Sequence, residues 1–265
     1  VHWPIIDEAA RLTRSPGFGA WRTAEVKSAQ KQTSDYGAES VIRKRRSAQA
    51  YDSDRSSMTY RQFVQTLSAT LPGSSAILNT LPLATNLHLV LFIHRVKDID
   101  PGLYCLVRNR SDLHELKGSF DPSFHWESMD RKLPLYLLQK GDFQSFATSV
   151  SCQQAIAGDS ALSLGMLTRF QPLLDPAPWL YPCLFWESGL IGQILYLQAE
   201  ASGLRGTGIG CYFDDPVHEL IGATDHSWQS LYHFTVGRPI EDPRLTTFPA
   251  YHHLEDNRRS GEMDP

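Results

Sequence analysis

The stretch WESGLIGQILYLQAEASG, residues 186–203, carries the strongest structural pattern in the sequence and leads into LRGTGIG, residues 204–210. Its apolar residues recur at helical spacing, and Gly203 is of the type that commonly ends a helix. The residues expected to pack are Leu190, Ile191, Ile194, Leu195 and Leu197. The stretch therefore predicts a long buried helix followed by a glycine-rich connection.

Four short apolar runs on either side of this helix predict strands. NLHLVLFIHRV (86–96) and DPGLYCLVRN (100–109) are joined by a Pro-Gly turn, so they predict an antiparallel hairpin. SALSLGMLTRF (160–170) predicts a third strand, and SLYHFTVGRP (230–239) predicts a strand that ends at a proline.

Shorter helices are predicted between these strands from apolar spacing and end signals. They cover residues 5–13, 56–73 with Ser57 as N-cap, 111–117 with Ser111 as N-cap, 141–158 opened by Asp142, and 213–222. The polar stretch 24–39 predicts an exposed connector, and the residues from about 255 a polar tail. Because helices and strands do not alternate regularly, an α+β fold is expected rather than a doubly wound sheet.

Length and composition restrict the classes of protein that fit. The 265 residues allow one large domain or two small ones, and a net charge of −4 argues against a general nucleic-acid binder. No apolar run reaches the roughly 18–20 residues of a membrane span. The sequence begins at Val1 without a charged-then-apolar leader, which favours a fragment or a processed form.

The four cysteines lack the spacing of a metal or redox motif. Cys105, Cys152, Cys183 and Cys211 are scattered without a CxxC pair, so neither a disulfide framework nor a zinc site is expected. A reducing cytoplasm is the expected location, and Cys152 is expected to be a core cysteine on an apolar helix face. The ten histidines show no HExxH-like spacing, so no metal site is predicted.

Two segments could form a binding site. The first is the basic run from Arg43 to Arg46, followed by Ser47, Gln49 and Tyr51; its guanidinium and hydroxyl donors match a phosphate, although a solvated charged surface remains an alternative.

The second segment is GLRGTGIGCYFDD (203–215), whose glycines allow backbone amides to approach a flat cofactor. A helix precedes these glycines, so the segment does not match a dinucleotide-binding fingerprint, and a plain connector is the alternative reading. Tyr212 and Asp214 beside the glycines are candidate proton donors or relays, or structural residues.

Five motifs in order resemble one family. They are RRSAQAYD (45–52), PGLYCLVRNRSDLHEL (101–116), SCQQAIAG (151–158), the long helix with its glycine-rich continuation (186–210), and YHFTVGRP (232–239). Together they resemble the nitroreductase superfamily of FMN-dependent oxidoreductases. Within it they are most similar to the branch that dehydrogenates thiazoline and oxazoline rings in peptides.

The resemblance implies a fold, a cofactor and a partner. The expected fold is a nitroreductase-like α+β sandwich with a mainly antiparallel central sheet flanked by helices. Residues 41–254 would form the FMN-binding domain, after an N-terminal extension or linker (1–40) and before the tail (255–265). FMN would lie at the interface of a homodimer, or between this domain and a second nitroreductase-like domain in cis. The other partner would be a small molecule or peptide, with no nucleic acid and no membrane.

The resemblance also implies roles for individual residues. Arg45, Arg46 and Ser47 would hold the flavin, and Gln49 would lie near its pyrimidine edge, where the absence of a positive charge lowers the reduction potential. The turn after the long helix would face flavin N5, and a late arginine would reach the phosphate. These residues are Gly208, Ile209, Gly210 and Cys211 for the turn, and Arg238 or Arg244 for the phosphate. Tyr212 is the expected catalytic base.

One departure from the branch leaves two functions open. The branch carries a Pro-Ser-x-Gly-Gly-x-Tyr-Pro loop before the first hairpin strand, where this chain has NTLPLATNLHL (79–89) without glycine, and a Lys-Tyr pair associated with azoline oxidation is not evident. The first function is an FMN-dependent oxidoreductase that dehydrogenates azoline rings or takes hydride from NAD(P)H. The second is a degenerate, non-catalytic domain that pairs with an active partner domain or binds peptide.

Overall fold

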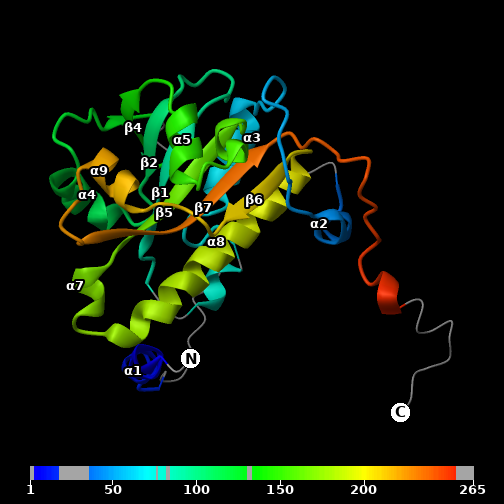
Figure 1. Ribbon diagram of the computed structural model, residues 1–265. Coiled ribbons are helices and arrows are strands. Elements are labelled where there is room, and N and C mark those ends of the chain that lie inside the picture. Colours follow the sequence, from blue (N-terminus) through cyan, green and yellow to red (C-terminus); the bar gives the residue numbers. More distant parts are fainter. Residues whose placement is uncertain (1–2, 18–35, 76, 82–83, 130–132, 255–265) are drawn as a thin grey trace, which may run out of the picture.

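The computed structural model describes residues 3–17, 36–75, 77–81, 84–129 and 133–254, built around one seven-stranded sheet (Figure 1). Its strand order is β3-β4-β2-β1-β5-β7-β6, and each neighbouring pair is antiparallel. The strands are β1 (Leu87–Ile93), β2 (Gly102–Leu106), β3 (Glu127–Ser128), β4 (Leu135–Lys140), β5 (Leu162–Arg169), β6 (Arg205–Ile209) and β7 (Trp228–Gly237). The predicted α+β fold with an antiparallel sheet and its opening hairpin is therefore confirmed.

Helices cover both faces of this sheet. Residues of α3 (Tyr60–Ser68) and α8 (Tyr181–Ala201) join the core on one face. Residues of α4 (Leu113–Ser119), α5 (Gln144–Val150), α6 (Ala155–Gly158) and α9 (Asp215–Ile221) join the core on the other. The remaining helices are α1 (Pro4–Leu12), α2 (Ala38–Lys44) and α7 (Gln171–Leu174), with three 3-10 turns at Leu78–Thr80, Arg110–Asp112 and Pro178–Leu180.

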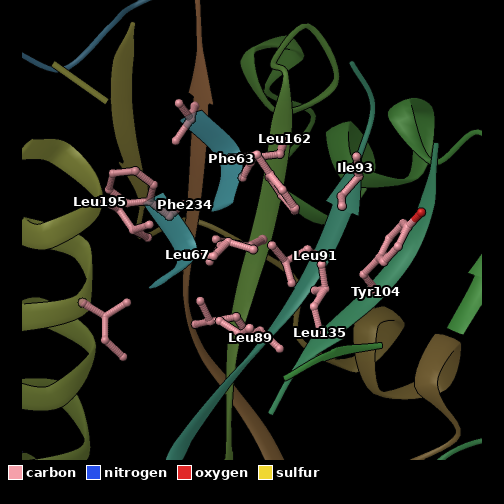
Figure 2. Close-up of a cluster of buried hydrophobic side chains, with 14 of the residues drawn as sticks. Phe63, Leu67, Leu89, Leu91, Ile93, Tyr104, Leu135, Leu162, Leu195 and Phe234 are labelled. Atoms are coloured by element: carbon pink, nitrogen blue, oxygen red, sulfur yellow. The ribbon is translucent and has the colours of Figure 1, made fainter. Parts of the chain in front are cut away.

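Burial on both faces explains why β1 is apolar at every position except His88. All seven of its residues are buried; Leu89 and Leu91 belong to the core under α3 and α8, whereas Val90 and Phe92 belong to the opposite core. Figure 2 shows Leu91 near the α3 residue Leu67 on the first side. An antiparallel strand with solvent on one face would instead alternate apolar and polar residues.

Two predicted helix starts are wrong by one or two residues. Thr59, not Ser57, is the N-cap of α3, because its hydroxyl accepts the Gln62 N–H while the Gln62 side chain accepts the Thr59 N–H. That reciprocal pair satisfies two N–H groups of the first turn, which a cap at Ser57 cannot do. Likewise α4 begins at Leu113, after a 3-10 turn that Asn109 caps in place of Ser111.

The single helix expected over residues 141–158 is two helices. The Asp142 carboxylate accepts the Gln144 N–H near the start, but the N-cap residue of α5 is Phe143, one residue after the predicted Asp142. However, α5 ends at Val150 and α6 begins only at Ala155. Between them Cys152 and Gln153 have left-handed backbone angles, with φ of 54° and 59°, which a right-handed helix excludes.

The glycine-rich connection after α8 contains an edge strand that the sequence pattern does not predict. The strand, β6, pairs with β7 along its whole length. A side chain at Gly206 would come within 2.6 Å of the Phe234 ring, which is fully buried, and one at Gly208 would overlap the Tyr232 side chain. The two glycines therefore make room for aromatic side chains of β7, and their low strand propensity hides the strand.

The long helix α8 begins at Tyr181, five residues before the predicted start, and gives way to Gly203 with φ of 70° as predicted. No helix within the described ranges is long and apolar enough to cross a membrane. The predicted connector (24–39) overlaps α2 at its end, but residues 18–35 and the tail 255–265 lie outside the described residues.

Candidate functional site

The basic segment lies along the free edge of β6, the last strand of the sheet. The Ala48 N–H donates to the Gly206 carbonyl at 3.3 Å, and the Thr207 hydroxyl donates to the Ala48 carbonyl at 2.8 Å. Three residues later the buried Tyr51 hydroxyl donates to the Arg205 carbonyl at 3.0 Å. The structure thus brings together the two segments that the sequence singles out, although Ala48 and Thr207 are 159 residues apart in the sequence.

Tyr196 of α8 joins the two segments. Its hydroxyl lies 2.9 Å from the Ser47 hydroxyl and accepts the Gly208 N–H at 2.8 Å. The Arg45 guanidinium lies over the Tyr196 ring at 4.8 Å, a cation–π distance. Three predicted residues are therefore held around a tyrosine that sequence reasoning missed, although it sits in the strongest predicted helix.

An open pocket of about 350 Å³ lies beside this junction. Arg46, Ser47 and Gln49 line it together, with Arg205 and the C-terminal segment 240–248. The Arg46 guanidinium donates to the carbonyls of Arg43 and Phe248 at 3.0 and 3.1 Å, so the C-terminal segment is held against it. The sequence does not predict Arg205 as part of the site, and of this segment it predicts only Arg244.

The donors of this pocket suit the phosphate end of a cofactor such as FMN. Two guanidinium groups, the Ser47 hydroxyl, the Gln49 amide and the Thr246 and Thr247 hydroxyls line it. Such charge-assisted donors are the usual partners of phosphate oxygens. Two carboxylates also line the pocket: Glu241 pairs with Arg205 at 2.8 Å, and Asp242 pairs with Arg244 at 2.7 Å.

The two late arginines do not reach the pocket in this arrangement. Arg244 is exposed and turned to Asp242, its neighbour two residues away, which lowers the pKa of the Asp242 carboxyl through their hydrogen bond. Arg238 is exposed, and its backbone binds the Ser56 hydroxyl and the Asp52 N–H.

The predicted turn follows β6 at Gly210. Unlike Gly206 and Gly208, Gly210 has open space where a side chain would stand, so its backbone is the part of the segment that another molecule can approach closely. Ile209 is buried in the core beneath it. Of the four predicted turn residues, Gly208 and Ile209 thus have structural roles, and Gly210 and Cys211 face outward.

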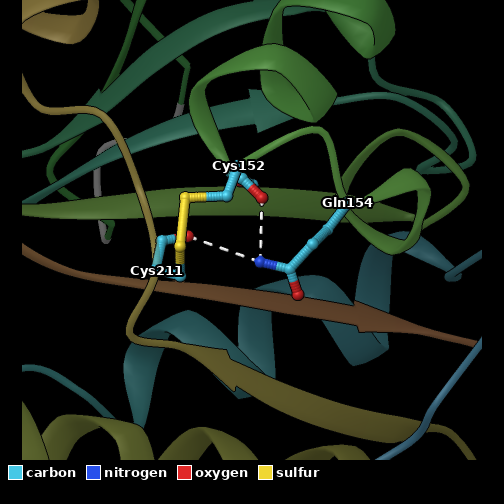
Figure 3. Close-up of a disulfide and its surroundings, with 4 residues drawn as sticks. Cys152, Gln154 and Cys211 are labelled. Carbon is cyan, nitrogen blue, oxygen red and sulfur yellow. Dashed lines mark hydrogen bonds between the residues drawn. A yellow bond between two sulfur atoms is a disulfide. The ribbon is translucent and has the colours of Figure 1, made fainter.

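The expectation of no disulfide is wrong, because Cys152 and Cys211 are bonded, with a Cα–Cα distance of 5.8 Å (Figure 3). Their separation of 59 residues gives no local motif, which is why the spacing rules miss it. Cys152 is accordingly not a core cysteine; it sits at the α5–α6 break. Cys105 and Cys183 remain free and buried.

Tyr212 lies against the buried end of the site rather than in the pocket. Its ring stacks on His233 at 4.3 Å, and its hydroxyl donates to the Ser230 carbonyl at 3.3 Å. Burial raises the pKa of the Tyr212 phenol to about 12, so at neutral pH it is a proton donor and not a base. Among the described residues no group of three or more His, Cys, Asp or Glu side chains is arranged to hold a metal ion.

Comparison with known proteins agrees with this architecture. No protein-family model and no curated protein sequence matches the chain. A solved structure assigned to the nitroreductases from Anabaena variabilis matches 77% of the chain at 20% identity, with a TM-score of 0.60. The match covers only 38% of the Anabaena chain.

Two further solved structures are similar over most of their own length. One, assigned to the nitroreductases from Ralstonia eutropha, has a TM-score of 0.57 at 15% identity and matches 86% of this chain and 94% of its own. The other, nitroreductase A from Vibrio parahaemolyticus, has a TM-score of 0.50 at 17% identity, with 82% and 74% covered. At these identities the likeness concerns the fold: the chain has the nitroreductase fold.

Proposed function

We propose that this chain binds FMN and acts as an FMN-dependent oxidoreductase. The observation that carries the proposal is the shared pocket of Arg46, Ser47 and Gln49 at the edge of β6, whose donors suit a phosphate. The open backbone at Gly210, joined to Ser47 through Gly208 and Tyr196, supplies a place for a flat ring to approach. The nitroreductase fold is consistent with both.

Each residue of the site has a distinct task in this proposal. Arg46 and Ser47 hold the phosphate end, while Arg45 and Tyr196 position the Ser47 hydroxyl. FMN, when bound, supplies the capacity to accept and donate hydride. Gln49 offers an amide but no positive charge to a reduced flavin, so we expect a low reduction potential. Tyr212, with its raised pKa, holds a proton beside the site.

We further propose that the substrate is an azoline ring in a modified peptide, or that NAD(P)H serves as hydride donor. Support for this step is the resemblance of the motifs to the azoline branch. The first test is the visible spectrum of the purified protein with and without added FMN. A retained flavin spectrum followed by NAD(P)H oxidation or azole formation supports the enzyme, whereas a folded protein that ignores FMN contradicts it.

A non-catalytic domain that pairs with an active partner is the second candidate function. It is favoured by Glu241 and Asp242, which bring negative charge into the pocket where a phosphate would bind. It is also consistent with the Anabaena structure, of whose chain this one spans only 38%. In this reading residues 41–254 are one half of a paired unit.

The surface of α8 supports pairing under either function. Tyr181, Phe185 and Trp186 are 40–46% exposed, and Gly189 and Gln193 continue the same uncharged surface. A helix that is apolar on its outer side as well as its inner side is usually buried by a partner. We propose that a second copy, or a second nitroreductase-like domain in cis, covers this surface.

Replacing Arg46 by methionine is expected to weaken FMN binding about 10- to 100-fold, because a charge-assisted bond to phosphate contributes roughly 1.5–3 kcal/mol. Fluorescence titration of FMN measures the dissociation constant. Arg110→Met is the matched control, since Arg110 is exposed on the 3-10 turn before α4 and away from the pocket. Equal losses in the two variants would count against a specific role for Arg46.

Replacing Phe185 by glutamate is expected to shift the protein from dimer to monomer, since a charge on the uncharged α8 surface must be desolvated when it is covered. Sedimentation velocity at several concentrations measures the mass. Met129→Glu, directly after β3, adds the same charge at a comparably exposed apolar side chain elsewhere, and it is expected to leave the mass unchanged. If the unsubstituted protein is already monomeric, the proposed pairing between copies is wrong.

A further inference from the structure

The Cys152–Cys211 disulfide joins two connections that meet beside the candidate cofactor site. Cys152 lies in the α5–α6 connection, and Cys211 lies in the turn between β6 and α9 that follows Gly210 (Figure 3). The Cys211 residue is exposed and Cys152 is partly exposed, so solvent thiols can reach the bond. Both residues of the disulfide therefore lie outside the buried core.

The other two cysteines cannot compete for this chemistry. Cys105 is fully buried in the sheet and Cys183 is almost fully buried in α8. Burial raises the pKa of both thiols, which keeps them protonated and poorly nucleophilic. Thiol chemistry in the native protein is thus confined to the Cys152–Cys211 pair.

The backbone at this bond is held away from its ordinary conformations. Cys152 and Gln153 both have left-handed φ angles, which residues with side chains adopt only when the surrounding structure requires them. Three links cross from this connection to the turn: the disulfide, the Phe213 N–H to the Val150 carbonyl at 2.7 Å, and the Gln154 amide to the Cys211 carbonyl at 3.4 Å. Only the disulfide among them is covalent and sensitive to reductants.

We propose that Cys152 and Cys211 form a thiol–disulfide exchange site whose redox state sets how firmly residues 210–213 are held. The chemical class of the reactant is a dithiol. Exposed disulfides of this kind are the ones that exchange readily, in contrast to buried structural disulfides. The consequence for FMN rests on the proposed function, because it assumes that the turn borders the flavin; the exchange itself does not.

The exchange proceeds in two balanced steps. A thiolate of the dithiol attacks the sulfur of Cys211, the more exposed of the two residues, the Cys152–Cys211 bond breaks, and Cys152 leaves as a thiolate. The second thiol of the reactant, as thiolate, then attacks the reactant sulfur that is bonded to Cys211. This closes the cyclic disulfide and releases Cys211 as a thiolate. The protein gains two electrons and two protons as two thiols, and the dithiol becomes a cyclic disulfide.

Reduction is expected to loosen the turn without unfolding the protein, because the two hydrogen bonds from Phe213 and Gln154 remain. Amide hydrogen exchange of residues 208–214 is therefore expected to become about ten-fold faster in the reduced protein, through local opening. If FMN binds as proposed, its dissociation constant is expected to rise several-fold.

The test begins with native protein equilibrated in mixtures of reduced and oxidised dithiothreitol, then alkylated and mapped by mass spectrometry. We expect Cys152 and Cys211 to be labelled together while Cys105 and Cys183 stay unlabelled. A pair that millimolar dithiothreitol cannot reduce in the folded protein would overturn the exchange site. So would air-oxidised protein in which both cysteines are already free thiols.

The coupling to the turn is tested in the Cys152→Ser/Cys211→Ser double variant, with Cys183→Ala as the matched control. The double variant is expected to show the fast exchange at residues 208–214 under all conditions, and the control to respond to dithiothreitol as the unsubstituted protein does. Exchange rates that do not depend on the redox state would overturn the coupling. Absence of FMN binding in both redox states would contradict the proposed function instead, and leave the alkylation and exchange results as they stand.

Discussion

Lowering the pH from 7 to about 4 is expected to destabilise the protein by roughly 3 kcal/mol for each of two buried histidines, His94 and His233. Burial lowers the pKa of both imidazoles from 6.5 to about 4. At His94 the neighbouring Arg95 lowers it further, against the opposing effects of the Ala157 carbonyl and Asp142. At His233 the charge of Asp214 opposes the lowering and His218 adds to it.

The sign follows from where each proton binds. In the unfolded chain both histidines take up a proton near pH 6.5, whereas in the folded protein they resist it until about pH 4. Unfolding therefore binds protons between these values, so stability is greatest above about pH 6.5 and falls steadily as the pH drops to about 4. Carboxyl groups with lowered pKa, such as Asp112 and Asp142, contribute only at lower pH.

Urea unfolding at pH 7.0, 6.0, 5.0 and 4.5 measures this dependence. His94→Gln is the informative variant, because an amide can still donate to the Ala157 carbonyl, which lies 3.2 Å from the His94 ring nitrogen. The slope of the unfolding free energy against pH reports how many protons the protein takes up on unfolding, and this variant is expected to reduce that number by about one. His114→Gln is the control, since His114 is exposed on α4 and is expected to leave the slope unchanged. A stability that is flat from pH 6.5 to 4.5 would contradict the prediction.

The strands that the sequence predicts correctly are those whose own residues carry the signal. The segments of β1, β2, β5 and β7 are apolar because both faces of the sheet are covered, and that pattern is local. The reason that β6 is a strand lies elsewhere, in Tyr232 and Phe234, which occupy the space above its glycines. No pattern within residues 205–209 indicates that this segment pairs with β7, so the sequence does not predict the strand.

The candidate site likewise has features that the sequence predicts and features that depend on residues far apart in the chain. Its two segments are recognisable by residue type, because guanidinium groups match phosphate oxygens and glycines let a backbone be approached closely. Three other features depend on tertiary structure. Both segments bind Tyr196, Arg205 lines the pocket, and the segment 240–248 is held against Arg46. The disulfide is the extreme case, because the partner of Cys152 lies 59 residues away in the sequence.

Replacing Glu187 by alanine is expected to destabilise the protein by about 3–5 kcal/mol, because it leaves a buried guanidinium without its counter-charge. Glu187 of α8 binds Arg108 at 2.5 Å, and their side chains are 7% and 1% exposed. Burial alone lowers the pKa of Arg108, and the charge and hydrogen bond of Glu187 oppose that effect. Arg108 in turn donates to the carbonyls of Thr70 and Leu87 at 2.7 and 2.9 Å.

Glu187 also fixes the chain just before β1. Its second oxygen accepts the Asn86 N–H at 3.0 Å, in the glycine-free segment that leads into β1. The acidic residue of the WESG motif is therefore structural here: it ties α8 to the ends of β1 and β2. Its alanine variant is expected to lose stability before any effect on a cofactor can be measured.

A double-mutant cycle measured by urea unfolding separates the interaction energy between Arg108 and Glu187 from the contribution that each side chain makes alone. Arg108→Met combined with Glu187→Leu is expected to recover much of the loss, because an apolar pair of similar volume leaves no unpaired charge. Asp100→Asn is the control, since it disrupts the Lys140–Asp100 pair, whose side chains are 63% and 62% exposed, and should cost at most about 1 kcal/mol. If Glu187→Ala costs no more than this surface control, water reaches Arg108 and the pair does not hold α8 to the sheet.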